Sequence, residues 1–330
     1  MSGANAVEIR INDPLLYRAP LPYCCRYYPY GFPVDVASDM REVLEAAQES
    51  FGAYAPRFDR PPIRLHVLTS QGSGVRPPAR EPVLRGQRHL LMWVSDQENF
   101  AVIDRRERFG YSSVTRATVA DRVFFRWHFL DAQIYMLLEL NYFTSLHAAC
   151  VAWDGAGVLL YGESGVGKST LTYACARRGW TYISDDASSF VWDGGRTVIG
   201  EPHHFRFRAE APDLFPELRG HTVGYELDRK PTIEVLTADL PVRTAPECRV
   251  EYIAFLDRCP GVRAGITRIG KEETRERLQQ DMPAFDPELD ARRSSAVESI
   301  AEAPAFALRY SDYAAALLLL EQIVHGGNAA

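Results

Sequence analysis

The 330-residue sequence predicts an α/β fold with two domains, a smaller α+β domain over residues 1–120 and a larger one over residues 121–330. Three observations predict it. The length fits one large domain or two moderate ones. The apolar run Val158–Tyr161 leads directly into a glycine-rich turn and a helix, which is a typical α/β unit. At Asp121 the spacing of apolar residues changes from the alternation of short strands to helical spacing.

Alternating residues and breakers define the elements of the first domain. A helix is predicted over Asp39–Phe51 with Ser38 as its N-cap. Residues 71–85 are rich in Gly, Pro and Arg, and they predict an exposed loop. The predicted strands are Val7–Ile11, Ile63–Leu68 and a small antiparallel meander of His89–Val94, Phe100–Ile103 and Gly110–Val114.

The second domain begins with an amphipathic helix over Asp121–Leu140, which would join the two domains. Strand Ser145–Trp153, the turn Asp154-Gly155 and strand Gly157–Tyr161 form a predicted hairpin. A helix over Ser169–Arg178 then ends before Gly179. The remaining predicted elements are strand Trp180–Ser184, a hairpin over Phe190–Val198, strands Thr232–Leu236 and Val250–Leu256, helix Lys271–Gln280, strand Ala307–Tyr310 and helix Asp312–Val324.

Composition and charge limit the classes of protein. The chain is 46% hydrophobic and 24% charged, as in an ordinary globular protein. Its net charge of −6 argues against a general nucleic-acid binder. The first residues lack the apolar core of a secretory signal, and the longest apolar stretch, Ala314–Leu320, is far too short to span a membrane. Six scattered cysteines favour a reducing compartment. We therefore expect a cytoplasmic protein without nucleic-acid or membrane partners.

Residues 157–170, GVLLYGESGVGKST, carry the most specific motif, the P-loop pattern Gly-x-x-x-x-Gly-Lys-Ser. Its glycines let backbone N–H groups point at phosphate oxygens, and the following helix adds its positive end. Lys168 offers a compact positive charge to the β- and γ-phosphates, although only three of the 37 basic residues Lys and Arg are lysines. Ser169 offers a hydroxyl ligand for Mg²⁺. A chance glycine turn is the alternative. We expect ATP and Mg²⁺ to be bound by Gly162, Glu163, Ser164, Gly165, Val166, Gly167, Lys168, Ser169 and Thr170.

An acidic pair, Asp185-Asp186, ends the strand that follows the P-loop helix. That end of the strand faces the loop in an α/β sheet, so one carboxylate could bind Mg²⁺ while the other accepts a proton from an incoming hydroxyl. A polar turn at the strand end is the alternative. His147, on the strand before the P-loop, could orient a carboxylate, or it could be a half-buried strand histidine.

Further candidates follow the acidic pair. Glu201 could supply another metal oxygen. Arg206 and Arg208 alternate along one face of a strand, where they could clamp a transferring phosphoryl group or an acidic group of a substrate. A solvated strand face is the alternative for both. Lys230 is a weaker candidate for the same task.

The order of His147, GESGVGKS, a helix ending at Arg178-Gly179, and ISDDAS resembles the catalytic domain of HPr kinase/phosphorylase and its relatives. The resemblance covers about residues 145–210 and implies a P-loop kinase domain related in fold to phosphoenolpyruvate carboxykinase. It implies that Asp185 is the general base, oriented by His147, and that Asp186 and Ser169 serve the metal. Glu201 corresponds approximately to a metal-binding glutamate of that family.

Some features differ from the bifunctional members of that family. The sequence lacks their Glu-Ile-Arg-Gly-type and Pro-Gly-Arg-Asn-type segments. The stretches GEPHHFRFRAEAPDLFPEL and FALRYSDYAAALLLLEQI resemble HPr-kinase-like proteins of peptide-modification clusters, including lasso-peptide kinases. The first domain does not resemble the N-terminal domain of true HPr kinases, and we expect it to recognise the substrate.

These observations predict an ATP- and Mg²⁺-dependent kinase that phosphorylates a hydroxyl, with Ser of a peptide or protein as the acceptor. A small-molecule kinase on the same core and a nucleotide-dependent switch without transfer are the alternatives. The sequence contains neither the LSGGQ signature of transporter ATPases nor the Asn-Lys-x-Asp motif of regulatory GTPases. Relatives in the resembled family often assemble, so a homo-oligomer agrees with the resemblance, although no residue pattern requires it.

Overall fold

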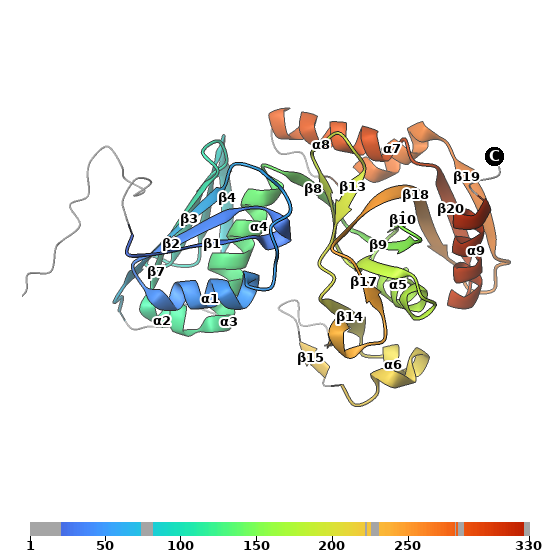
Figure 1. Cartoon of the computed structure of the whole chain (residues 1–330), viewed down its shortest axis with the longest axis horizontal. Helices are drawn as coiled ribbons and strands as arrows, with labels where there is room; N and C mark the ends of the chain where they lie inside the picture. The colour runs from blue at the N-terminus through green and yellow to red at the C-terminus, as the bar shows by residue number, and fades with distance from the viewer. Residues whose placement is uncertain are drawn as a thin grey trace, which may run out of the picture. The chain divides into compact units, whose positions relative to one another are not determined.

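The structure is a computed structural model that describes residues 21–73, 82–221, 223–225, 231–280, 282 and 287–326. It divides into two compact units, Met1–Tyr142 and Phe143–Ala330 (Figure 1). The sequence placed the boundary at residue 120, but the helical segment that follows packs within the first unit. The predicted strand Val7–Ile11 and residue Lys230 lie outside the described residues, as do residues 74–81 of the predicted loop.

The first unit is built on a seven-stranded sheet in the order β1-β2-β3-β7-β6-β5-β4. Strands β2, β3 and β7 are parallel, and the other neighbours are antiparallel. The strands are β1 (Tyr23–Tyr27), β2 (Val34–Ser38), β3 (Ile63–Ser70), β4 (Val83–Gln87), β5 (Leu90–Val94), β6 (Phe100–Asp104) and β7 (Phe109–Thr115). The predicted meander is confirmed as β5-β6-β7. The edge strand β4 begins at residues 83–85, which the sequence assigned to a loop.

The helices of the first unit pack against β1, β2, β3 and β7. They are α1 (Arg41–Phe51), α2 (Arg116–Ala120), α3 (Arg122–Phe125), the π-helical turn η2 (Arg126–Asp131) and α4 (Ala132–Glu139). The N-cap of α1 is Met40, not Ser38, because the Ser38 hydroxyl instead accepts a hydrogen bond from the Met40 amide just before the helix. The predicted continuous helix over Asp121–Leu140 is interrupted by the π-helical turn.

The second unit contains a ten-stranded sheet in the order β17-β11-β9-β10-β18-β13-β12-β8, with β20 beside the second half of β18 and β19 beside β20. Its strands are β8 (Phe143–Leu146), β9 (Ala148–Trp153), β10 (Ala156–Tyr161), β11 (Thr181–Ser184), β12 (Ser188–Val191), β13 (Thr197–Ile199), β17 (Arg243–Thr244), β18 (Glu247–Arg258), β19 (Gly265–Ile269) and β20 (Ala305–Tyr310). The two-residue turn between β9 and β10 is confirmed, with φ of 47° at Asp154 and 84° at Gly155.

Helices cover both faces of this sheet (Figure 1). They are α5 (Lys168–Arg177), α7 (Lys271–Gln279), α8 (Pro287–Ile300) and α9 (Tyr313–Gly326). Val158 and Leu160 of β10 pack in the core with α5 and α9, whereas Leu159 and Tyr161 pack in the core with α7 and α8. Burial on both faces explains why β10 is a continuous apolar run.

A three-stranded sheet, β14-β16-β15, packs beside α5. The elements of this small subdomain are β14 (His204–Arg208), α6 (Ala211–Leu214), β15 (Val223–Tyr225) and β16 (Pro231–Leu236). The ring of Tyr173 on α5 contacts Phe205 and Phe215, with centroids 5.1 and 4.8 Å away. This aromatic cluster attaches the small sheet to the P-loop helix.

Strand direction brings distant residues to one edge of the large sheet. Strand β10 is parallel to β18, and β18 is parallel to β20. Strand β9 is antiparallel to both β10 and β11, so β11 runs in the direction of β10. The carboxyl ends of β10, β11, β18 and β20 therefore lie at the same edge. Among the described residues, no helix is long and apolar enough to cross a membrane.

The predicted strand Ser145–Trp153 is instead two strands, and the break falls at His147. Strand β8 pairs with β12, whereas β9 pairs with β10 and β11. The chain must change partners between them, and this change interrupts the strand.

Gly200 marks a close backbone approach beside the end of β11. A Cβ atom there would lie 2.0 Å from the carbonyl oxygen of Ile183. We expect Gly200→Ala to lower the free energy of unfolding by about 1–3 kcal/mol, because the backbone cannot yield as a flexible side chain would. Thermal unfolding of the full chain measures the effect.

Gly265→Ala is the matched control, since no described atom beyond its chain neighbours lies within 4 Å of its Cβ position. Its effect should stay within about 0.5 kcal/mol. Equal melting midpoints for both variants would contradict the close approach.

Candidate active site

The P-loop joins β10 to α5 through a turn that only glycine suits at two positions. The φ angles of Gly165 and Gly167 are 88° and 101°, in the left-handed region. A Cβ atom on Gly167 would also lie 2.5 Å from the hydroxyl of Tyr313. Backbone shape and close packing thus both require glycine at residue 167.

Lys168 and Ser169 begin α5 at the mouth of this turn. The Lys168 side chain is largely enclosed, with the residue 6% exposed, and its ammonium donates to the carbonyl oxygens of Gly162 (2.7 Å) and Glu163 (3.3 Å). The Ser169 hydroxyl donates to the backbone carbonyl of Asp185 at 3.5 Å. A compact cation and a hydroxyl are therefore held beside the amides of the turn, as a phosphate site requires.

Asp185 follows β11 and is buried, with 8% of the residue exposed. Its Oδ2 accepts a hydrogen bond from the backbone N–H of Arg206 at 3.0 Å. Burial raises the pKa of Asp185 from 3.8 to about 6; the Arg206 amide opposes this rise, and the negative charge of Asp186 adds to it. A carboxylate with such a pKa is ionised at neutral pH and remains a useful proton acceptor.

Unlike Asp185, Asp186 is open to solvent, with 63% of its side chain exposed. His147 Nδ1 lies 3.3 Å from Asp186 Oδ1. The pairing of His147 with Asp185 that the resemblance implied is therefore corrected: the imidazole faces Asp186. At the bend after β11, Asp185 is enclosed by the protein, whereas Asp186 is exposed beside His147.

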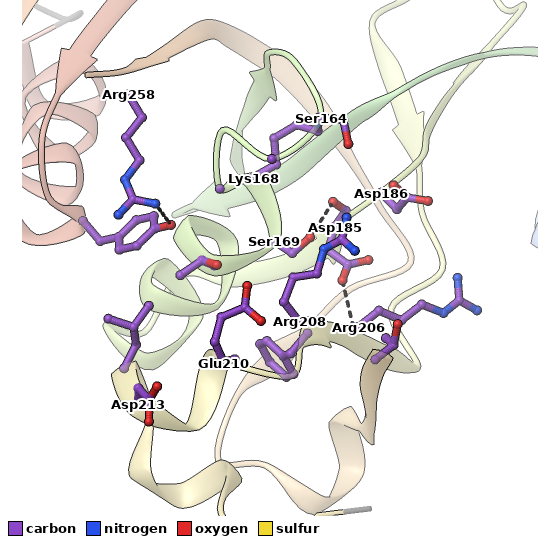
Figure 2. Close-up of a pocket in the computed structure, with 18 of the residues that line it drawn as sticks. Ser164, Lys168, Ser169, Asp185, Asp186, Arg206, Arg208, Glu210, Asp213 and Arg258 are labelled. Atoms are coloured by element: carbon purple, nitrogen blue, oxygen red, sulfur yellow. Dashed lines mark hydrogen bonds between the residues drawn. The ribbon is translucent and has the colours of Figure 1, made fainter. Parts of the chain in front are cut away.

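These residues surround a cavity of about 590 Å³ (Figure 2). The predicted residues that line it are His147, Ser164, Gly165, Gly167, Lys168, Ser169, Thr170, Asp185, Asp186, Arg206 and Arg208. Gly162, Glu163 and Val166 lie behind it, where their carbonyl oxygens accept from Lys168 or from Tyr310. The two arginines reach the cavity from β14, and in Figure 2 their side chains leave the strand in different directions.

The donor atoms suit Mg²⁺ held together with phosphate. Among the described residues, no group of three or more His, Cys, Asp or Glu side chains is arranged to hold a metal. Mg²⁺ seldom needs such a cage, because it is usually bound by one or two protein oxygens together with phosphates and water. Ser169 and Asp186 present such oxygens in the cavity. Glu201 is exposed and is absent from the residues that line the cavity, so its predicted role as a ligand gains no support.

Several residues of the cavity were not among the predicted site residues. They are Phe207, Glu210, Ala211, Asp213, Leu214, Thr232, Arg258 and Tyr313. Arg258 ends β18 and Tyr313 follows β20, at the same sheet edge as the P-loop. The signal in the sequence was that both positions follow predicted strands, but their strand order and direction were unknown.

Residues 139–209 match the family model described as the HPr Serine kinase C-terminal domain. This stretch runs from the end of α4 to the end of β14 and contains the P-loop, the acidic pair and both arginines. The match includes the carboxyl ends of β10 and β11 but not β18 or β20, and it covers less than a quarter of the chain.

Three curated relatives are HPr kinase/phosphorylases. The chain is 40% identical to that of Lactobacillus delbrueckii subsp. bulgaricus over 67 residues, covering 20% of this chain and 21% of the relative. Identity to the Lactobacillus acidophilus protein is 39% over 149 residues, with 45% and 41% covered. Identity to the Mycoplasmopsis pulmonis protein is 24% over 173 residues, with 52% and 50% covered. The chain thus spans between a fifth and a half of the length of these relatives.

A solved structure, the Hpr(Ser) kinase/phosphatase from Coxiella burnetii, is 16% identical. It aligns over 56% of this chain and 96% of that chain, with a TM-score of 0.29.

The raised pKa of Asp185 has a measurable effect on stability. Between about pH 4 and pH 6, the folded protein keeps a proton on Asp185 that the unfolded chain has lost. The free energy of unfolding should therefore fall as pH rises through this window, by about 2–3 kcal/mol from this group. Asp185→Asn removes the titration and should flatten that part of the profile.

Denaturant unfolding from pH 4 to pH 7 compares wild type, Asp185→Asn and the matched control Asp154→Asn. Asp154 lies in the β9–β10 turn, at the opposite end of that hairpin from the P-loop. Parallel profiles for wild type and Asp185→Asn would show that Asp185 titrates as an ordinary aspartate.

Proposed function

We propose that this protein is an ATP- and Mg²⁺-dependent kinase that transfers the γ-phosphoryl group to a hydroxyl, with Ser of a peptide or protein as the acceptor. The observation that carries the proposal is the buried Asp185 carboxylate, with a pKa raised to about 6, beside the lysine and serine of a P-loop. The match of residues 139–209 to the HPr Serine kinase C-terminal domain supports it.

Each group has a distinct task in this proposal. Residues Gly162–Thr170 hold the triphosphate, and Lys168 offsets negative charge on its β- and γ-phosphates. Mg²⁺, held by Ser169 and Asp186, would supply further positive charge. Asp185 removes the proton from the acceptor hydroxyl while the oxygen of that hydroxyl bonds to the γ-phosphorus. The bond from that phosphorus to the β–γ bridging oxygen breaks, and ADP leaves.

The two arginines and His147 complete the arrangement. Arg206 and Arg208 line the cavity and can stabilise negative charge on the transferring group. His147 orients Asp186, from which it is 3.3 Å away. The proposal assigns no role to Glu201, which is not among the residues that line the cavity.

The exposed side of the site favours a peptide over a small metabolite. The side chains of His147 and Asp186 are 47% and 63% exposed, so an acceptor approaches Asp185 from an open surface. Two stretches of the sequence resemble HPr-kinase-like proteins of peptide-modification clusters. We therefore assign the acceptor to the peptides that such clusters modify. We assign substrate recognition to the first unit. A cytoplasmic location belongs to the same proposal.

Asp185→Asn tests the proposed base. It keeps an oxygen that can accept from the Arg206 amide, so nucleotide affinity should stay within about threefold. Transfer of label from γ-labelled ATP to a library of serine-containing peptides should fall about 100- to 10,000-fold. Asp154→Asn should behave as wild type. Normal transfer by Asp185→Asn would eliminate Asp185 as the base.

Lys168→Arg tests the need for a compact charge. The enclosed ammonium lies 2.7 Å from the Gly162 carbonyl, and a planar guanidinium is too broad for that position. Transfer should fall about 100-fold. Lys271→Arg is the matched control, since Lys271 forms surface ion pairs with Glu298 and Glu302. Equal activity of the two variants would show that Lys168 is not a specific phosphate ligand.

A further inference from the structure

The cavity has two chemically different ends along the edge of the sheet. Strand order places β11 on one side of the P-loop strand and β18 and β20 on the other. The acidic pair follows β11, whereas Arg258 ends β18 and Tyr313 follows β20. Figure 2 shows Arg258 and Asp186 on opposite sides of Lys168. The reaction proposed above uses only the β11 end.

A nucleoside triphosphate is also chemically two-ended. Its reacting γ-phosphate and its nucleoside lie at opposite ends of the phosphate chain. If the γ-phosphate faces Asp185, the nucleoside must extend from the P-loop toward β18 and β20. The residues at that end are thus the ones available to contact it.

Those residues form a surface attached to the P-loop, made of a tyrosine ring with an arginine guanidinium over it. The guanidinium of Arg258 lies over the ring of Tyr313 at 4.6 Å, and its Nη1 donates to the Tyr313 hydroxyl at 2.8 Å. The same hydroxyl packs against Gly167, where a Cβ atom would be only 2.5 Å away. The buried Tyr310, just before this turn, donates from its hydroxyl to the Val166 carbonyl at 3.2 Å. The position of the surface is therefore tied to that of the phosphate loop.

The small subdomain supplies further contacts that suit a nucleoside. Leu214 lines the cavity from α6, and 52% of this apolar residue remains exposed. The neighbouring Asp213 also lines the cavity, and its carboxylate would repel phosphate but accept hydrogen bonds from sugar hydroxyls or a base amine. The small subdomain is attached to α5 through Tyr173, so this side is fixed relative to the P-loop as well.

We infer that Tyr313 and Arg258 form the base-binding surface of this cavity, where a purine base stacks, with Leu214 and Asp213 contacting the nucleoside. This subsite rests on the proposed function, because the acidic pair defines which end of the cavity receives the γ-phosphate. Aromatic rings and arginine planes stack well on purines. Tyr313 and Arg258 bind the base and take no part in proton or phosphoryl transfer.

Calorimetric binding of Mg²⁺-ATP and Mg²⁺-tripolyphosphate to the full chain tests the subsite. Wild type should bind ATP more tightly than tripolyphosphate. Tyr313→Ala should weaken ATP binding about tenfold and leave tripolyphosphate binding within about twofold. Tyr313→Phe keeps the ring and should bind ATP within about threefold of wild type.

A second pair of variants leaves the contact between Tyr313 and Gly167 of the P-loop intact. Leu214→Ala should weaken ATP binding about threefold and leave tripolyphosphate binding unchanged. Leu318→Ala is the matched control, since Leu318 is similarly exposed (56%) on α9 and is not among the residues that line the cavity. It should change neither affinity.

Three results would overturn the subsite. The first is that Tyr313→Ala weakens the binding of ATP and of tripolyphosphate equally. The second is that Tyr313→Ala and Leu214→Ala both bind ATP as tightly as the wild type. The third is that the wild type binds ATP and tripolyphosphate with equal affinity. The measurement needs no acceptor and no phosphoryl transfer. A failure of the proposed kinase reaction therefore leaves this result readable, and a failure of the subsite leaves the test of Asp185 intact.

Discussion

The carboxylate of Asp185 is buried at the end of β11, where the backbone N–H of Arg206 donates to it at 3.0 Å. An unpaired buried charge would cost several kcal/mol, so this hydrogen bond is the condition for placing a base there. The donor belongs to β14, and the bond therefore holds Arg206 and Arg208 of the small subdomain beside the carboxyl end of β11. One interaction both stabilises the carboxylate and supplies a wall of the cavity.

The rest of the site depends on how the strands and the small subdomain are attached to α5. Tyr173 packs against Phe205 and Phe215, which keeps β14 and α6 beside the P-loop helix. The shared direction of β10, β11, β18 and β20 gathers their carboxyl ends at one edge. The P-loop, the enclosed Lys168 and the buried Asp185 are thereby brought to one cavity, as the proposed transfer requires.

Local residues predicted the P-loop and most elements of the second unit, because glycine conformation, helix ends and two-residue turns depend on neighbours in the chain. The β9–β10 turn at Asp154-Gly155 and the left-handed Gly179 after α5 agree with those predictions. Two predictions differ from the structure: the continuous strand Ser145–Trp153 and the pairing of His147 with Asp185. The strand breaks at His147, and His147 faces Asp186, because of which strands lie next to one another. Strand neighbours are set by residues far apart in the chain, so local sequence does not reveal them.

Other features of the site left only a weak local signal. Arg258 and Tyr313 meet because β18 and β20 are parallel neighbours, although the two residues are far apart in the chain. Residues 83–85 form part of an edge strand, despite a glycine- and arginine-rich context that favours a loop. The π-helical turn at Arg126–Asp131 interrupts the predicted helix at a place where the sequence has no glycine or proline to mark it.

The fate of the γ-phosphoryl group distinguishes transfer to a hydroxyl from hydrolysis by water. ATP is incubated with the wild-type protein, Mg²⁺, serine-containing peptides and hydroxyl metabolites in ¹⁸O-labelled water, and the products are identified by mass spectrometry. The account predicts phosphoserine on a peptide, with no oxygen from the solvent in the transferred group. Free phosphate that has gained a solvent oxygen as the only product, or unchanged ATP, would contradict it; a phosphorylated metabolite would keep the reaction but overturn the peptide acceptor.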